Sequence, residues 1–299
     1  MPAMTEPTTC TLEVPGAVLR YDVREATGAA GPPLLMVGSP MDASGFGSLA
    51  ARFPDRTVVT YDPRGTGRSV RTDATPPSPQ VHAGDLSRVI AAACGGPVDV
   101  FASSGGAVNA LALAARHPGA VRTVVAHEPP LATLLPDREH ALAAIRHIRR
   151  VYERDGLGAG MAYFISLTSI QGEIPAGFAE LPAPDPAAFG FPPGDDGSRD
   201  DPLLGQNLIS CTHYEPDFAA LRAAPVRVVF AVGAESAGQL AYRAAVAAAE
   251  RLGAQLVEFP GGHAGFLGGE YGMQGDPDGF AAVLRRVLGG DGEPAGDAA

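Results

Sequence analysis

The pattern of apolar and polar positions along this chain is typical of short buried strands separated by helices. Strands buried on both faces of a parallel sheet are largely apolar, and the helices between them cover the two faces. Runs of this kind lie at 34–38, 57–62, 98–103, 121–128, 226–233 and 255–261. Two further runs, at 11–16 and 17–23, predict an antiparallel pair at the sheet edge. We therefore expect an α/β protein with a doubly wound, mostly parallel sheet of eight strands.

The strand pattern is interrupted between about 131 and 224, where the sequence becomes helical in character. Apolar residues within 138–156 have the spacing of one helix face, and 159–170 is also expected to be helical. The stretch 182–202 is rich in Pro, Gly and Asp and predicts an exposed loop. These features predict three parts: a core made of 1–130 and 225–290, a helical cap inserted at 131–224, and a flexible tail at 291–299.

Composition and charge narrow the class of protein. The chain is 45% hydrophobic and 18% charged, which is typical of a globular protein, and no apolar run is long enough to cross a bilayer. The first ten residues do not resemble a signal peptide, so a cytoplasmic protein is expected. A net charge of -11 disfavours binding to nucleic acid. Cys10, Cys94 and Cys211 are widely spaced, which predicts free thiols rather than disulfides or a zinc site. The oligomeric state is not readable from the sequence.

The segment 98–118 is the most informative for chemistry, because a buried strand runs through small residues into an amphipathic helix. A serine hydroxyl becomes a useful nucleophile when a sharp strand-to-helix turn exposes it, and such a turn requires small neighbours. Ala102, Ser104 and Gly106 fit this pattern, so the segment resembles the nucleophile elbow of the α/β hydrolases, although the family usually has glycine at the position of Ala102. Centring the turn on Ser103 instead would put Phe101 at a position that requires a small residue. The alternative is a glycine-rich helix start of the kind found in nucleotide-binding folds.

A second segment with the same resemblance lies at 57–69. Its Asp-x-Arg-Gly-x-Gly-x-Ser string follows a predicted strand and looks like the loop after the fourth strand in that family. We expect Asp62 and Arg64 in this string to brace loops beneath the site rather than to take part in chemistry.

The general base is predicted from the segment 255–266, where a strand ends in Pro-Gly-Gly and is followed by His263. Members of the family carry their base histidine on such a loop after the eighth strand, and its ring must reach the nucleophile. The histidines in or next to predicted helices are expected on the surface: His82, His117, His140 and His147. His213 lies in the insertion, and a place in the lining of a pocket is the less favoured of the positions open to it.

The acid that orients the histidine has two candidates. The family usually places it after the seventh strand, three residues beyond a glycine, and that position here holds Ser236, with Glu235 one residue earlier. A second solution in the family places it directly after the sixth strand, where this chain has Glu128. A carboxylate that ends a buried strand requires a partner, and an imidazole above the sheet would supply it. Glu128 is therefore preferred, with Glu235 as the alternative.

An oxyanion hole is expected from two backbone N–H groups. Gly105, directly after the nucleophile, supplies the first. The second comes from the loop at 37–46, where Ser39 matches the family's donor position, Pro40 has no N–H, and Met41 is the alternative donor.

The resemblance covers essentially the whole chain and implies a serine hydrolase without metal or organic cofactor. Ser104 would attack an ester-like carbonyl and His263 would take its proton. The substrate is expected to be a small, moderately hydrophobic ester, lactone or thioester, because the insertion segments 159–170 and 203–214 are apolar.

Other functions on the same scaffold remain open at this point. A peptidase of the proline iminopeptidase type and a cofactor-free haloperoxidase are the enzymatic alternatives. A haloalkane dehalogenase or epoxide hydrolase is disfavoured, because both require aspartate at the position of Ser104. A ligand-binding protein without activity is the alternative outside the enzymes, since Ala102, Val37 and Ser236 depart from the family pattern.

Overall fold

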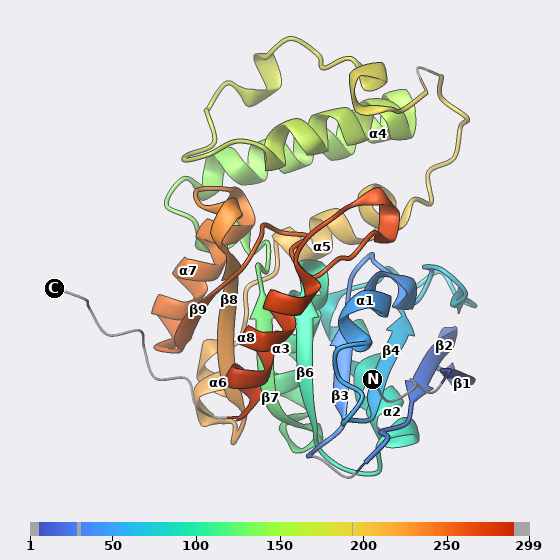
Figure 1. Ribbon diagram of the computed structural model, residues 1–299. Helices are drawn as coiled ribbons and strands as arrows, with labels where there is room; N and C mark the ends of the chain where they lie inside the picture. The colour runs from blue at the N-terminus through green and yellow to red at the C-terminus, as the bar shows by residue number, and fades with distance from the viewer. Residues whose placement is uncertain (1–5, 29–30, 193, 290–299) are drawn as a thin grey trace, which may run out of the picture.

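A computed structural model describes residues 6–28, 31–192 and 194–289. Its centre is one sheet of nine strands, in the order β1-β2-β4-β3-β6-β7-β8-β9, with β5 paired to β2 outside that path (Figure 1). The strands from β4 across β3 to β9 are parallel, and β2 pairs antiparallel with β1, β4 and β5. Their bounds are β1 Thr8–Val14, β2 Ala17–Arg24, β3 Leu34–Val37, β4 Val58–Asp62, β5 Val70–Arg71, β6 Val98–Ser103, β7 Val121–His127, β8 Arg227–Gly233 and β9 Gln255–Phe259.

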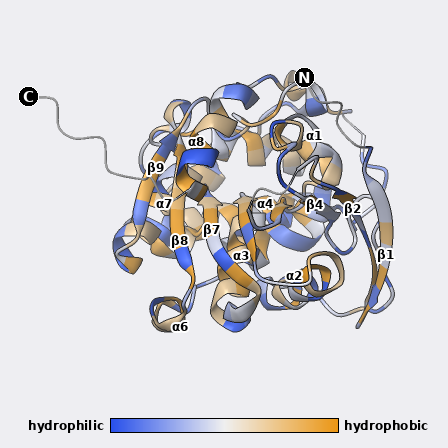
Figure 2. Ribbon diagram, turned by 60° about the horizontal axis from the view of Figure 1, so that its bottom comes forward, coloured by the Kyte–Doolittle hydropathy of each residue, from blue (hydrophilic) through white to orange (hydrophobic). Residues whose placement is uncertain are grey.

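Helices cover both faces of this sheet, and the central strands are correspondingly apolar (Figure 2). One face packs against α2 (Pro79–Ala93), α3 (Gly105–Arg116) and α7 (Leu240–Leu252), whose alanines, valines and leucines belong to the larger hydrophobic cluster. The other face packs against α1 (Gly47–Ala50) and α8 (Pro277–Gly289), where phenylalanines dominate. Burial on both faces explains why the strands are apolar throughout rather than alternating.

The structure confirms the expected doubly wound, mostly parallel sheet with its antiparallel edge. All eight expected strands form. The ninth, β5, was missed because it has only two residues and leaves Val70 60% exposed, so that it carries no apolar pattern. The expected tail at 291–299 lies outside the described residues.

The segment between β7 and β8 contains only helices and turns among its described residues. Its longest element, α4 (Arg138–Thr168), is broken at Gly156, whose φ of 87° is outside the helical range, so the two helices expected there meet at a kink. Figure 1 shows α4 lying across the carboxyl ends of the strands, with α5 (Leu208–Thr212) beneath it and α6 (Phe218–Ala223) leading back to β8. The described part of the expected loop at 182–202 is largely exposed; it includes the short 3-10 turn Pro186–Phe189 and ends where the helical turn Pro202–Asn207 begins.

The insertion and the core share one hydrophobic cluster. Ile145, Ile148 and Tyr152 of α4 belong to the same cluster as the alanines of α3. Within the described ranges, no helix is both long enough and apolar enough to cross a membrane.

Candidate active site

The turn between β6 and α3 holds Ser104 in an unusual backbone conformation. Its φ of 57° and ψ of -129° lie in a region that residues with a side chain rarely adopt, and such outliers gather at functional sites. The turn is fixed on both sides, since the Ser104 N–H donates to the His127 carbonyl at 2.9 Å and the Ser104 carbonyl accepts from Ala107 at 2.9 Å. A Cβ at Gly106 would lie 2.4 Å from the Val37 carbonyl oxygen, so only glycine fits there. The turn therefore has the geometry that the small-residue pattern predicts.

The two serines of the turn have different surroundings. Ser104 is partly exposed at the carboxyl edge of the sheet, whereas Ser103 is 3% exposed and its hydroxyl contacts the His127 ring. Ala102 is fully buried, so the extra methyl group relative to glycine fits in the core. Of the two serines, Ser104 is therefore the one with exposed surface.

Glu128 follows β7 and turns its carboxylate toward the histidine loop. Its φ of 47° takes the chain out of the strand conformation, and its N–H donates to the Ala231 carbonyl at 2.9 Å. One carboxylate oxygen accepts from the Gly233 N–H at 2.9 Å, and the other lies 2.5 Å from His263 Nδ1. The structure thus brings together Glu128 and His263, which are 135 residues apart in the sequence.

The electrostatics of this pair favour a charged carboxylate. The Glu128 side chain is 1% exposed, and burial by itself raises the pKa of a carboxyl group. The hydrogen bond from His263, the nearby imidazole charges and the Gly233 N–H act in the opposite direction and outweigh burial, so that the pKa of Glu128 falls to about 2. His263 keeps 43% of its side chain exposed, so one edge of its ring is accessible from solvent.

Glu235, the alternative acid, occupies a different environment. It is exposed in the short turn Ala234–Ser236, and its backbone N–H donates to the Gly261 carbonyl at 3.0 Å. The described residues make no hydrogen bond or ion pair with its carboxylate. Ser236, at the family's usual acid position, is 1% exposed, and its hydroxyl has no partner among the described residues.

The loop after β3 brings Ser39 against the start of α3. A Cβ at Gly105 would lie 2.6 Å from the Ser39 carbonyl oxygen and 3.2 Å from Cys211 Sγ, so the loop after β3, the start of α3 and the insertion meet at this glycine. Ser39 precedes Pro40 through a cis peptide bond and is 4% exposed. The Met41 side chain instead packs against Gly45.

The Asp-Pro-Arg-Gly segment lies beneath this loop. Asp62 accepts from the backbone N–H groups of Ala43 at 3.0 Å and Arg68 at 2.8 Å, so it ties two loops together. Arg64 forms two hydrogen bonds of 2.7 Å to the buried carboxylate of Asp85 on α2. Both residues have the bracing geometry that the sequence predicts.

Comparison with known proteins decides the family. The model of the alpha/beta hydrolase family matches residues 34–283. The hydrolase YraK of Bacillus subtilis (strain 168) is 31% identical over 265 residues, which cover 86% of this chain and 89% of the relative. This chain belongs to the α/β-hydrolase family. Its sheet order and flanking helices are those of the family's fold, and the protein is a hydrolase of this fold.

Two solved structures share the fold of this hydrolase. A thermophilic esterase from Thermogutta terrifontis has a TM-score of 0.60 at 18% identity, with 96% of this chain and 99% of the other covered. Est816, described as an N-acyl homoserine lactone degrading enzyme, has a TM-score of 0.61 at 19% identity, with 92% and 99% covered. At such identities the likeness concerns the fold alone.

The remaining histidines of the hydrolase differ in their surroundings. The expectation of a surface position is wrong for His82, which is fully buried on α2 because the insertion covers it; its Nε2 lies 3.1 Å from Asn207 Oδ1. His140 is exposed, and His117 and His147 are partly exposed. His213 is half-buried and contacts the Thr212 hydroxyl.

Sequence reasoning gave no role in the site to His127, which ends β7. Its ring lies 6.0 Å from the ring of His263, and its carbonyl accepts from the Ser104 N–H. The signal that could have identified it is its place directly before Glu128. Among the described residues, no hydrogen bond joins Ser104 Oγ to His263, and no group of three or more His, Cys, Asp or Glu could hold a metal ion.

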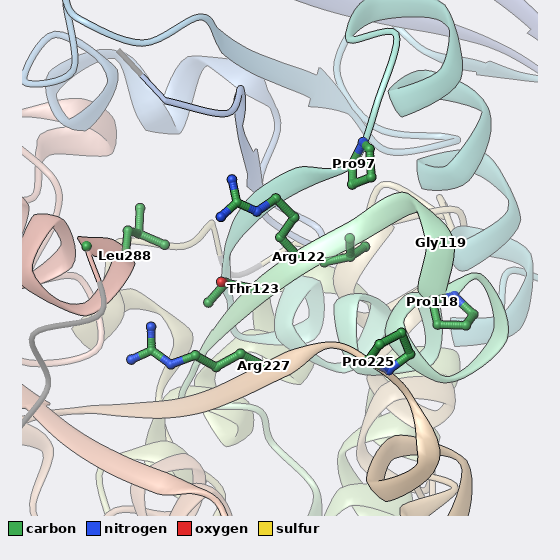
Figure 3. Close-up of a pocket in the computed structure, with 10 residues that line it drawn as sticks. Pro97, Pro118, Gly119, Arg122, Thr123, Pro225, Arg227 and Leu288 are labelled. Atoms are coloured by element: carbon green, nitrogen blue, oxygen red, sulfur yellow. The ribbon is translucent and has the colours of Figure 1, made fainter.

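The hydrolase also has a hollow of about 550 Å³ far from these residues (Figure 3). It lies at the amino ends of the central strands, whereas Ser104 and Glu128 lie at the carboxyl ends. In open α/β sheets, ligands bind in a crevice outside the carboxyl ends of the strands. The hollow is lined by Pro97, Pro118, Gly119, Val121, Arg122, Thr123, Pro225, Arg227, Leu288 and Gly289.

Proposed function

We propose that this hydrolase is a serine hydrolase that cleaves an ester-like bond through an acyl-enzyme on Ser104. The observation that carries the proposal is the 2.5 Å contact between the buried Glu128 carboxylate and His263 Nδ1. An acceptor at Nδ1 keeps the proton on that nitrogen and leaves Nε2 free to act as a base. The strained backbone of Ser104, at the neighbouring strand end, supports its role as the nucleophile.

In the proposed reaction, Ser104 Oγ forms a bond to the carbonyl carbon while its proton passes to His263 Nε2. The carbonyl electron pair moves onto oxygen and gives a tetrahedral oxyanion. Collapse of this intermediate breaks the bond to the leaving group, which takes the proton from His263. Water then gives a proton to His263 and attacks the acyl group, and a second collapse returns the proton to Ser104 and releases the acid. Glu128 remains ionised and stabilises the imidazolium in both halves.

The oxyanion is proposed to bind the backbone N–H groups of Gly105 and Ser39. The approach of the Ser39 carbonyl to Gly105 supports this pair, because it brings the two residues to one place. Met41, whose side chain packs against Gly45, is the less favoured donor. Donors fixed before reaction stabilise charge that develops only in the transition state.

The substrate is proposed to be a small, moderately hydrophobic carboxylic ester, lactone or thioester, and the insertion is proposed to act as a cap over it. Cys211 on α5 lies beside Gly105, so the insertion reaches the reacting groups. Apolar residues of the insertion, including Ile209 and Met161, are only partly buried where they pack against the larger hydrophobic cluster. The esterase and the lactone-degrading enzyme show that this fold can carry the hydrolysis of ester-like bonds.

A fluorophosphonate probe tests the nucleophile directly. The wild-type protein should be labelled on the peptide that contains Ser104, and Ser104→Ala should not be labelled. Ser198→Ala is the matched control, because Ser198 is exposed on the loop at 194–201. A wild type that resists the probe, or equal labelling of wild type and Ser104→Ala, contradicts the proposal.

The class of substrate is tested by a panel of p-nitrophenyl esters with acyl chains of increasing length, together with lactones and thioesters. The proposal predicts the highest kcat/KM for one of the shorter or medium acyl chains. Turnover of proline-terminated amides without turnover of esters would favour the peptidase instead.

A further inference from the structure

His127 is a buried titratable residue that the proposed reaction does not use. It ends β7 and is paired in register with Ser103, which ends β6. It is fully buried, and its ring lies within 6.3 Å of four phenylalanine rings: Phe101, Phe259, Phe266 and Phe280. The one described hydrogen bond of its ring joins Nδ1 to Ser103 Oγ at 3.1 Å, and Nε2 is buried without a partner among the described residues.

Packing alone does not explain a histidine at this position. Phenylalanine would fill the aromatic cluster without burying polar nitrogens, and alanine at Ser103 would remove the matching hydroxyl. Polar groups that a core tolerates at a cost to stability tend to mark functional positions. Burial lowers the pKa of His127 to about 4, so the ring is neutral at pH 7.

His127 also neighbours the proposed nucleophile, acid and base. Its carbonyl holds the Ser104 N–H at 2.9 Å, and Glu128 is the next residue in the chain. Its ring lies 6.0 Å from that of His263 with 27° between the ring planes, which is a stacked arrangement. The residue therefore connects the nucleophile turn, the acid and the base.

We propose that Ser103 and His127 form a positioning pair that fixes the ring of His263 from beneath while the same strand ends hold Ser104 and Glu128. This inference rests on the proposed serine hydrolase function. The Ser103 hydroxyl sets the orientation of the His127 ring, and that ring forms a flat neutral surface against which His263 stacks. When His263 takes the proton of Ser104, the neutral neighbour adds no repulsion and keeps water from that face.

The hydrogen bonding also indicates the tautomer of His127. A buried N–H without an acceptor is rarer than a buried lone pair without a donor. The proton is therefore expected on Nδ1, where it donates to Ser103 Oγ, and Nε2 carries the lone pair toward the aromatic cluster. Nitrogen NMR of labelled histidine distinguishes this tautomer from the reverse one.

A double-mutant cycle tests the pair, with His127→Phe, Ser103→Ala and the double variant compared with wild type. Misplacing a catalytic group by about 1 Å costs up to about a hundredfold in rate, so each variant should lose roughly ten- to a hundredfold in kcat with KM changed less than about twofold. The double variant should lose about as much as either single one, because the two residues act as a unit. The thermal midpoint should stay the same or rise.

Proton NMR supplies a readout that does not depend on turnover. The His263 Nδ1 proton that faces Glu128 should give a downfield signal in the wild type, and this signal should shift or broaden in His127→Phe. If His127→Phe fails to fold, Ser103→Ala changes less volume and carries the same test. An unchanged kcat, or a fall in kcat that follows a fall in the thermal midpoint while the signal stays in place, overturns the inference.

The probe experiment on Ser104→Ala separates this failure from failure of the proposed function. Labelling of Ser104 in wild type together with full activity of His127→Phe rejects only the positioning pair. Wild type that is not labelled rejects the serine hydrolase itself.

Discussion

Replacing Glu128 with glutamine removes the charge of the buried carboxylate while nearly preserving its shape. Glutamine is as compatible as glutamate with the φ of 47° at this position, so the substitution adds no backbone strain. It can still accept from the Gly233 N–H, which the carboxylate binds at 2.9 Å. What changes is the contact of 2.5 Å with His263 Nδ1, where a carboxylate can only accept and an amide can present an N–H.

The expected loss follows from the two consequences of that change. An amide N–H facing Nδ1 favours the tautomer with its proton on Nε2, which cannot act as a base toward Ser104. The imidazolium that forms during reaction also loses its buried counter-charge. The equivalent change in a catalytic triad lowers kcat about 10⁴-fold, which corresponds to about 5 kcal/mol. Glu128→Gln should therefore retain roughly one ten-thousandth of the wild-type kcat.

The measurement is initial-rate hydrolysis of a p-nitrophenyl ester at pH 7 to 8, with thermal unfolding as a check on folding. Glu235→Gln is the matched control, since Glu235 is exposed and its carboxylate has no described partner; it should stay within about threefold of wild type. A Glu128→Gln variant within tenfold of wild type would refute the reasoning. Large losses from Glu235→Gln and small ones from Glu128→Gln would assign the acid to Glu235 instead.

Four further outcomes are expected. The pKa of Glu128 is about 2 in the folded protein against an ordinary value of 4.5, so its contribution to stability is present above pH 4.5 and is lost as the pH falls toward 2. In urea unfolding between these two pH values, the free energy of unfolding of wild type should fall by about 3 kcal/mol more than that of Glu128→Gln. Ser104→Gly should be inactive yet more stable than Ser104→Ala by about 1 kcal/mol, because glycine relieves the strain at φ 57°, and equal thermal midpoints would contradict this. Arg64→Met should cost about 3–5 kcal/mol in urea unfolding by leaving the Asp85 carboxylate buried without its partner, and Arg64→Met combined with Asp85→Leu should recover most of the loss. Gly106→Ala should lower the free energy of unfolding by about 1–3 kcal/mol, since its methyl group would meet a backbone oxygen at 2.4 Å, and a neutral effect in calorimetry would show that the turn is looser than described.

Local signals in the sequence were sufficient for the sheet and for the elbow. Each buried strand is recognisable from its own apolar run, and the turn at Ser104 is recognisable from the small residues around it. The structure gives the reason for one of them, because Gly106 has no room for a side chain. These features depend on neighbours in the chain or on the general requirement that a doubly covered sheet be apolar. A strand as short as β5 falls below that kind of signal.

The positions of the polar groups in the site depended on contacts between distant segments. The sequence favours Glu128 over Glu235 as the acid only through the argument that a carboxylate ending a buried strand requires a partner. The fold shows that Glu128 is buried against His263 while Glu235 faces solvent. His82 looked like a surface residue because Asn207, the residue of the insertion that its ring contacts, lies 125 residues further along the chain.

The sequence by itself therefore determined the layered sheet, the strand-to-helix turn at Ser104 and the loop that carries His263, because each follows from a local pattern of volume and polarity. The tertiary structure decided between the two candidate carboxylates by placing Glu128 against that histidine, and it alone showed which second histidine lies beside it. The physical reason is that hydrogen bonds and ring contacts act over a few ångströms between residues that are far apart in the chain, so they produce no periodic pattern in the sequence.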